Sequence, residues 1–282
     1  MKNLKVHPPR RSNWEREEGV SYLVAIDIDG TLVNHDGAMS QAVQETVQAV
    51  SEAGHHVVIS TGRSIGATMP VVEQVNITRG NAISSNGAVT LELSPALPNK
   101  HRIIDRVTFD PSYAISALKD RLPHASLALE APDGVIYGTD SFEDGSFGVE
   151  TVKRTRTEMA AMDAATRLVI YSETDTPDSF KRAIYDVGLH GVNYAVGWTA
   201  WLDIVAHGVS KASALEQIRR QLRVDPRHTI ALGDGLNDKE MIHWAARGVA
   251  MGQASQELVD LATDVTGSIY EDGVVPILQE LL

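Results

Sequence analysis

The chain of 282 residues contains no cysteine. This absence excludes a disulfide scaffold, a cysteine nucleophile, a cysteine-based zinc finger and an iron–sulfur cluster. Any metal ion must therefore be held by oxygen or by histidine. The ten histidines show no HExxH or similar ligand spacing, so we assign none of them to a metal site.

The chain also lacks an excess of basic residues. Lys and Arg number 25 against 37 Asp and Glu, which gives a formal net charge of −12. Such a field repels polyanions, so we expect no nucleic-acid partner. Hydrophobic residues make up 43% and charged residues 22%, a balance typical of globular domains and unlike that of disordered chains.

Long apolar runs are missing as well. The longest, such as residues 22–26, have the length of a strand, whereas a membrane-spanning helix needs about 20 residues. Arg10 and Arg11 are followed by no apolar run, which argues against a twin-arginine export signal. We therefore expect a cytoplasmic protein without membrane association. Residues 1–19 are charged and show no periodicity, so we predict a flexible extension there.

The sequence does contain an alternation of strand and helix patterns. Residues 21–28 and 57–59 are nearly continuous apolar runs, which are typical of strands buried on both faces of a parallel sheet. Between them, Ser40 is a suitable N-cap for a helix that ends before Gly54. This order of elements predicts an α/β fold.

The middle of the chain follows another pattern. Over residues 89–200 the apolar runs alternate more and lie among Gly, Pro and Asp, which favours an antiparallel sheet. The first pattern then returns, with strands predicted over 228–232 and 248–251. We therefore predict a Rossmann-like parallel sheet core formed by residues 20–88 and 201–282, with residues 89–200 as an inserted α+β cap domain.

Aspartates follow two strands of the predicted core, in the motifs DIDGT and GDGLND. Because ligands bind at the carboxyl ends of strands in open α/β sheets, we expect these carboxylates to converge. They are Asp27, Asp29, Asp234 and Asp238. Clustered carboxylates repel one another, and a divalent cation with oxygen ligands, best Mg²⁺, relieves that repulsion. A calcium loop is excluded, since its acidic fifth and twelfth positions are Thr31 and Ala38 here.

The spacing within DIDGT suits a reacting centre. In extended backbone, residues two apart point the same way, so Asp27 and Asp29 could face one atom, one attacking while the other moves protons. Gly30 permits a sharp exit of the chain. Taken alone, two aspartates before a glycine are more typical of a turn.

Two further polar positions complete a phosphate pocket. Thr61, beside Gly62, follows the second strand and can offer a hydroxyl and nearby amides to phosphate oxygens at a helix start. Lys211 opens a later helix and supplies positive charge. A cation at a helix start is mildly unfavourable, so this lysine requires another reason. Arg63 by itself is interpreted as a surface charge or a helix-end partner.

The ordered set of DIDGT, STGR, the lysine of GVSK and GDGLND resembles the haloacid dehalogenase superfamily of phosphatases. SNGA and the large insert resemble its Cof-type branch with a C2-type cap. The resemblance covers residues 21–282, and four motifs in order are far more specific than any one. The sequence departs from the common pattern in two places. The residue after Gly235 is often acidic in the family and is Leu236 here, and Ala212 and Ser213 stand where Gly-Thr is frequent. Neither departure removes a catalytic group.

The resemblance implies a Mg²⁺-dependent phosphatase that hydrolyses a small phosphorylated metabolite, with a sugar phosphate as the expected class, through an aspartyl-phosphate. Asp27 would be the nucleophile, and Asp29 the general acid and then the base. The implied metal ligands and supporting residues are Asp27, Asp29 through its backbone carbonyl, Asp234, Asn237 and Asp238. The implied phosphoryl- and substrate-binding residues are Thr61, Gly62, Asn86, Gly87, Lys211 and Asn237. By itself, Asn86 before Gly87 is typical of a turn.

The inserted domain would close over the pocket and recognise the leaving group. Candidate contacts, which the sequence does not rank, are Glu130, Asp133, Asp140, Asn193, Trp198 and Trp201. Three alternatives stay open. A phosphomutase shares every motif, a phospho-accepting regulatory module also uses an acid cluster with a lysine, and a protein of this fold could serve as an inactive scaffold. Asp29 argues against the regulatory module because a second acid suits turnover. The oligomeric state is not indicated.

Overall fold

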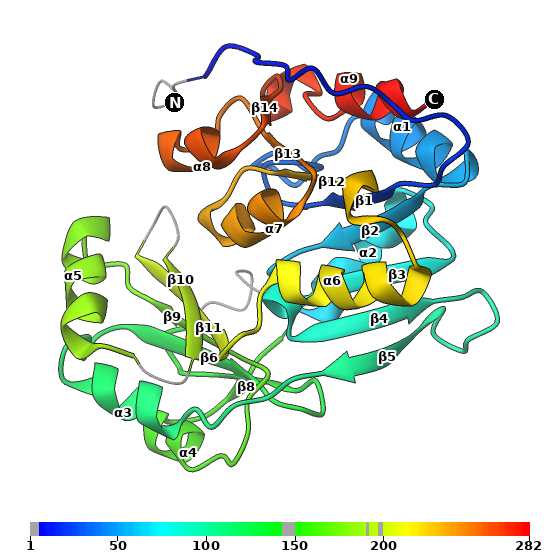
Figure 1. Ribbon diagram of the computed structural model, residues 1–282. Coiled ribbons are helices and arrows are strands. Elements are labelled where there is room, and N and C mark those ends of the chain that lie inside the picture. Colours follow the sequence, from blue (N-terminus) through cyan, green and yellow to red (C-terminus); the bar gives the residue numbers. More distant parts are fainter. Residues whose placement is uncertain (1–5, 143–149, 190–191, 197–199) are drawn as a thin grey trace.

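The structure, a computed structural model, describes residues 6–142, 150–189, 192–196 and 200–282. Two β-sheets, each packed against helices, make up the molecule (Figure 1). No helix in these described ranges is both long and apolar enough to cross a bilayer.

The larger sheet has eight strands in the order β14-β13-β12-β1-β2-β3-β4-β5. β1 (Leu23–Ile26) lies inside it, pairs in parallel with β12 and β2, and is buried throughout, as the apolar run predicts. β4 and β5 extend the sheet in antiparallel pairing. The other strands are β2 His56–Ser60, β3 Gly80–Ser84, β4 Val89–Leu93, β5 His101–Arg106, β12 Thr229–Gly233, β13 Arg247–Ala250 and β14 Asp264–Val265.

Helices cover both faces of this sheet (Figure 1). Apolar side chains of α1, α2 and α9 join the core on one face, and those of α6, α7 and α8 join the core on the other. As predicted, Ser40 caps α1, since its Oγ accepts a hydrogen bond from the Val43 amide at 3.1 Å. The helices are α1 Gln41–Glu52, α2 Ile65–Gln74, α6 Lys211–Leu222, α7 Lys239–Trp244, α8 Gln256–Leu261 and α9 Val275–Leu278, with 3₁₀ turns η1 Ser85–Gly87, η3 Pro226–His228, η4 Leu236–Asp238, η5 Ile269–Glu271 and η6 Gln279–Leu281.

The smaller sheet has six strands in the order β10-β11-β9-β6-β7-β8, and all its pairings are antiparallel except β7 with β8. Three helices pack against one of its faces through alternate apolar residues of β6, β9 and β11. The elements are β6 Ser126–Glu130, β7 Ile136–Gly138, β8 Val152–Lys153, β9 Arg167–Tyr171, β10 Val192–Val196, β11 Trp201–Ala206, α3 Ser112–Lys119, α4 Arg156–Ala160 and α5 Pro177–Val187.

The two sheets confirm the predicted α/β core with an inserted α+β unit, but the unit begins and ends later than predicted. β4 and β5 lie after residue 88 yet belong to the core sheet, and β11 lies after residue 200 yet belongs to the smaller sheet. The segment that forms the smaller sheet and its helices thus runs from the end of β5 at Arg106 to Ala206. We call this segment the inserted unit. The boundary was misplaced because β4 and β5 run antiparallel at the sheet edge, and their sequences alternate like those of an antiparallel domain.

The amino-terminal segment also differs from the prediction. Residues 6–19 run along the core rather than forming a free extension (Figure 1). Arg10 exchanges two backbone hydrogen bonds with Val265 of β14, at 2.9 and 2.7 Å. Its guanidinium donates to the carbonyls of Val259 and Ala262 at 2.9 and 2.6 Å. These partners lie some 250 positions away in sequence, so a local pattern does not reveal them.

Candidate active site

Carboxylates gather where β1 and β12 end, as expected for neighbouring parallel strands. Asp27 follows β1, and its amide donates to the Leu232 carbonyl of β12 at 3.0 Å. Asp234 and Asp238 follow β12. Among the described residues, these three acids could hold a metal ion together, because their ligand oxygens lie within 4.8 Å of one another.

Lys211 lies in the middle of this cluster, at the start of α6. Its side chain is fully buried, with Nζ 2.5 Å from Asp27 Oδ1 and 2.6 Å from Asp238 Oδ1. Ser210 caps the helix by accepting from the Ser213 amide at 3.2 Å. Burial lowers the pKa of Lys211, but Asp238 and Asp27 outweigh it, and the pKa lies above its usual value. The lysine therefore stays charged, which explains a cation at this helix start.

One lysine does not balance three buried carboxylates. Burial, and then the charge of Asp238, raise the pKa of Asp27 well above its usual value. The same two causes, in the same order, raise the pKa of Asp234 to about 7. A donor set of buried oxygens with excess negative charge is the kind that binds a hard divalent cation. The residues present therefore fit a site for a hard divalent cation.

Asp238 differs from the other two acids in its role. Its Oδ2 accepts hydrogen bonds from the amides of Asp234 and Gly235 at 3.0 and 2.9 Å, while Oδ1 faces Lys211. Both oxygens thus hold neighbouring groups in place. The geometry fits the supporting position that the resemblance implies for Asp238.

Asp29 is the predicted residue whose surroundings differ most from the expectation. Its side chain is 61% exposed and forms a bidentate ion pair with Arg63, at 2.9 Å from Nε and 2.6 Å from Nη2. The hydrogen bond to Asp29 raises the pKa of Arg63. Arg63 Nη1 does donate to the Ala67 carbonyl in the first turn of α2, at 3.4 Å, but our interpretation of Arg63 as a surface charge or helix-end partner missed its pairing with Asp29. The available signal was its position, directly after the second core strand and therefore beside the end of the first.

The remaining predicted residues form the wall next to Lys211. The amide of Asn86 donates to the Thr61 carbonyl at 3.0 Å, and Asn237 Nδ2 donates to Asn86 Oδ1 at 3.0 Å. Gly87 has φ 99°, and a Cβ there would lie 2.1 Å from the Ser210 carbonyl oxygen. The loops after β2, β3 and β12 therefore meet the first turn of α6, and only glycine fits at position 87.

Several buried polar atoms at these strand ends lack partners. Within the described residues, Thr31 Oγ1 and Asn86 Nδ2 are among those that are buried and have no hydrogen-bond partner. Thr31 follows Gly30, whose φ of 77° and missing side chain leave room for Asp234, since a Cβ would lie 2.1 Å from Asp234 Oδ2. Buried donors are normally satisfied, so these two are suited to a ligand's oxygens.

Sequence reasoning missed Gln253. Its buried amide Nε2 donates to the Gly30 carbonyl at 2.6 Å and approaches Asp234 Oδ2 at 3.3 Å, while Oε1 accepts from the Ile269 amide at 3.0 Å. Gln253 thus joins the first aspartate loop to Asp234. It follows β13, the next strand across the sheet, but no local pattern distinguishes it from a surface glutamine.

The inserted unit contributes to this region through few of the predicted contacts. Glu130 is buried and bonded to Ser85 of η1. Trp201 Nε1 donates to its neighbour Asp203 at 2.9 Å. Asp133 Oδ1 accepts a local hydrogen bond from the Val135 amide at 3.0 Å, and Asp140 is exposed. Trp198 and the side chain of Asn193 lie outside the described residues.

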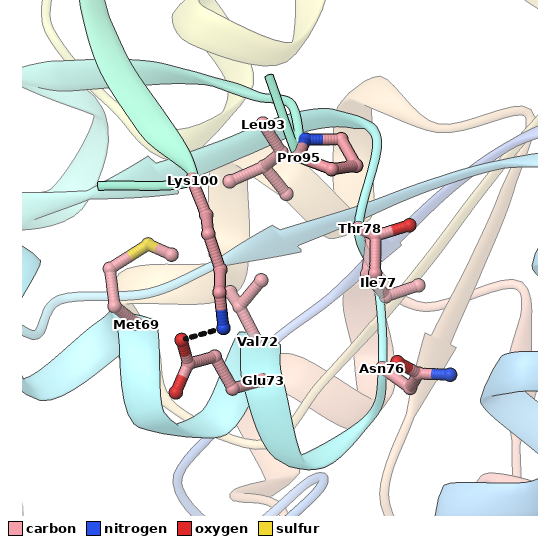
Figure 2. A pocket seen from close by; sticks show the side chains of 9 residues that line it. All are labelled: Met69, Val72, Glu73, Asn76, Ile77, Thr78, Leu93, Pro95 and Lys100. Carbon is pink, nitrogen blue, oxygen red and sulfur yellow. Dashed lines mark hydrogen bonds and ion pairs between the residues drawn. The ribbon is translucent and has the colours of Figure 1, made fainter. Parts of the chain in front are cut away.

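A separate cavity of about 160 Å³ lies between α2 and the start of the β4–β5 connection (Figure 2). Its apolar lining includes Met69, Val72 and Leu93, and the Lys100–Glu73 ion pair, 3.1 Å long, lies at one side. None of the carboxylates of the cluster lines it. The chemistry therefore belongs to the strand ends and not to this cavity.

The shifted pKa of Asp234 predicts a pH-dependent metal affinity. Its ordinary value is 3.8 and its folded value is about 7. Between these values the folded, metal-free protein holds a proton that the unfolded chain releases, so its free energy of unfolding falls as the pH rises. The same proton must leave before a cation binds, so the affinity for Mg²⁺ rises about tenfold per pH unit below that pKa.

Thermal unfolding with increasing Mg²⁺ measures this effect. We expect a larger Mg²⁺-induced rise in melting temperature at about pH 8 than at about pH 5.5. The matched control is Asp36→Asn, which changes an exposed aspartate in the loop after β1 and should preserve the difference. Equal rises at both pH values would contradict the assignment of Asp234 to the cation site.

Comparison with solved structures defines the class of fold. The HAD subclass IIB sugar phosphatase BT4131 superposes with a TM-score of 0.78 at 21% identity, covering 93% of this chain and 100% of that one. A structure of a protein from Thermotoga maritima, TM0651, gives a TM-score of 0.71 at 22% identity, covering 92% and 97%. These likenesses show that the core, the inserted unit and their order form a fold shared with both structures.

The sequence matches the haloacid dehalogenase-like hydrolase family over residues 24–278, and the chain belongs to that family. Two similar proteins of Bacillus subtilis (strain 168) have named activities. The 5-amino-6-(5-phospho-D-ribitylamino)uracil phosphatase YitU is 28% identical, with 92% of this chain and 97% of YitU aligned. The phosphatase YwpJ is 26% identical, with 92% and 99% aligned. These comparisons confirm the resemblance drawn from the four motifs.

Proposed function

We propose that this protein is a Mg²⁺-dependent phosphatase that hydrolyses a small phosphorylated metabolite, with a sugar phosphate as the expected class, through an aspartyl-phosphate. The observation that carries the proposal is the Lys211 ammonium, buried between Asp27 and Asp238 at the end of β1. The activities named for the relatives YitU and YwpJ support it.

In the first half-reaction, a carboxylate oxygen of Asp27 attacks phosphorus. The bond from phosphorus to the leaving oxygen breaks, and Asp29 gives its proton to that oxygen. The ion pair with Arg63 occupies both carboxylate oxygens of Asp29, so it must open before this step. In the second half-reaction, Asp29 takes a proton from water, the water oxygen attacks phosphorus, and phosphate leaves Asp27.

The other residues hold the phosphoryl group in place. Lys211 supplies a fixed positive charge beside the attacking oxygen, where burial strengthens its effect. Thr61 and Gly62 follow the second strand and offer the Thr61 hydroxyl and the Gly62 amide to the phosphoryl oxygens. The side chain of Asn86 offers its Nδ2–H, unpaired among the described residues, to a phosphoryl oxygen.

Asp27, Asp234 and the backbone carbonyl of Asp29 would hold Mg²⁺, with Asn237 and Asp238 as supporting residues. When bound, Mg²⁺ supplies positive charge that reduces the repulsion between an anionic nucleophile and an anionic substrate.

Phosphate release from a panel of phosphorylated metabolites tests the proposal. We expect turnover of sugar phosphates in Mg²⁺ that falls at least about tenfold when a chelator removes the metal. Stable labelling of Asp27 without phosphate release would favour a phospho-accepting regulatory module. Transfer of the phosphoryl group to a second hydroxyl, rather than to water, would identify a phosphomutase.

A further inference from the structure

Glu130 connects the inserted unit to the core. It ends β6, where Leu127 and Leu129 face the helices of the inserted unit. Because side chains alternate along a strand, Glu130 lies on the opposite face. It is 3% exposed, and its Oε2 accepts a hydrogen bond from Ser85 Oγ at 2.7 Å, although Ser85 belongs to the core.

Polar and charged groups surround the buried carboxylate of Glu130. Burial raises the pKa of Glu130, while the hydrogen bond from Ser85 and the charges of Arg167 and Arg106 oppose the rise. Glu130 pairs with Arg167 in the sheet register, and Arg167 Nε lies 2.5 Å from Asp203 Oδ1. A buried polar group must find partners, so this position is better suited to a fixed contact than to packing alone.

Ser85 begins the turn that forms the wall of the active site. Ser85 and Asn86 have φ values of 51° and 54°, in the left-handed region that non-glycine residues rarely adopt. The Ser85 amide donates to the Arg63 carbonyl at 2.8 Å, and the Asn86 amide donates to Thr61. The turn is therefore held on one side by the carbonyls of Thr61 and Arg63 and on the other by Glu130.

The side chain of Asn86 lies against Gly62. A Cβ on Gly62 would approach Asn86 Oδ1 to 3.0 Å and Nδ2 to 3.2 Å. Oδ1 already accepts from Asn237, so the orientation of the amide is set. Nδ2, on a residue only 7% exposed, has no partner within the described chain. A buried N–H at this place calls for an acceptor that arrives with a ligand.

We propose that Glu130 is a positioning residue of the inserted unit, which acts through Ser85 to hold Asn86 so that its Nδ2–H donates to an oxygen of the bound phosphate ester. The inference rests on the proposed function. It couples the position of the inserted unit to the competence of the core, because the backbone turn that carries Asn86 is fully held only while Glu130 reaches Ser85.

Variants that separate the hydrogen bond from the charge test this proposal. Ser85→Ala removes the donor, Glu130→Met removes the acceptor at similar volume, and Glu130→Gln removes the charge but keeps an acceptor oxygen. With p-nitrophenyl phosphate and Mg²⁺, we expect Ser85→Ala and Glu130→Met to raise KM about fivefold with kcat within about twofold, since Asn86 binds ground and transition states alike. Glu130→Gln should restore KM to near the wild-type value.

Two further measurements distinguish positioning from general damage. The double variant of Ser85→Ala and Glu130→Met should be no worse than either single variant, because one interaction is lost in all three. Hydrogen exchange of the amides of residues 84–88, in the protein without substrate or metal, should accelerate in both single variants. Glu173→Met, at an exposed position of the inserted unit, is the matched control and should change neither quantity.

Additive KM effects in the double variant, a Glu130→Gln variant as impaired as Glu130→Met, or unchanged exchange in residues 84–88 would each overturn the inference. Absence of turnover by the wild-type protein on every phosphate ester is a different result, because it contradicts the proposed function. The exchange measurement requires no activity, so unaltered exchange still overturns the inference in that case.

Discussion

The Asp27→Asn variant is expected to lose at least about 10⁴-fold in kcat/KM while remaining as stable as the wild type, because it removes the nucleophile and little else. Asparagine has the shape of aspartate and still offers an oxygen to Lys211. Burial and neighbouring carboxylates raise the pKa of Asp27, so the fold disfavours its charged form. Removing that charge therefore relieves repulsion, and the free energy of unfolding without metal should not fall.

Phosphate release and urea unfolding in the presence of a chelator measure the two quantities on the same sample. Asp36→Asn removes a carboxylate from the exposed loop after the first strand and should leave both unchanged. Residual turnover of the Asp27→Asn variant within about tenfold of the wild type would exclude Asp27 as the nucleophile. A large loss of stability would mean that its carboxylate has a structural role.

The parts of the site that could be predicted from the sequence are those that follow from single strands. The apolar run at residues 21–28 predicts a buried parallel strand, and strands of that kind bring their carboxyl ends to one edge. Asp27 and Asp234 therefore meet as expected. Ser40 likewise caps its helix as predicted, because a capping serine acts on an amide only three residues away.

The features that were missed depend on contacts between distant segments. Arg63 and Gln253 are ordinary surface residues in a local pattern, and only the neighbouring strand ends give them partners such as Asp29 and Gly30. The amino-terminal segment has no periodicity, yet Arg10 finds its carbonyl partners at the far end of the chain. The placement of β4 and β5 likewise depends on which sheet has a free edge. The alternation of apolar and polar residues within the two strands does not indicate this.

Lys211→Met is expected to reduce both activity and stability, and this combination separates it from Asp27→Asn. Methionine has a similar length but leaves the carboxylates of Asp27 and Asp238 buried without their cation. Removing one partner of a buried ion pair costs about 3–5 kcal/mol of unfolding free energy. Loss of a fixed charge beside the reacting group should lower kcat at least about 10³-fold.

The pH dependence of the stability lost in the Lys211→Met protein tests the cause of that loss. If unpaired carboxylates destabilise the Lys211→Met protein, protonating them at about pH 5 should recover part of the stability lost at about pH 8, since protonated acids carry no charge to compensate. Added Mg²⁺ should recover part of it at the higher pH by supplying another cation. Lys239→Met is the matched control, because Lys239 pairs with Glu257 at 2.5 Å on the surface, where such pairs contribute at most about 1 kcal/mol. If the stability of the Lys211→Met protein changes with neither pH nor Mg²⁺, Lys211 stabilises the fold by packing and not by its charge.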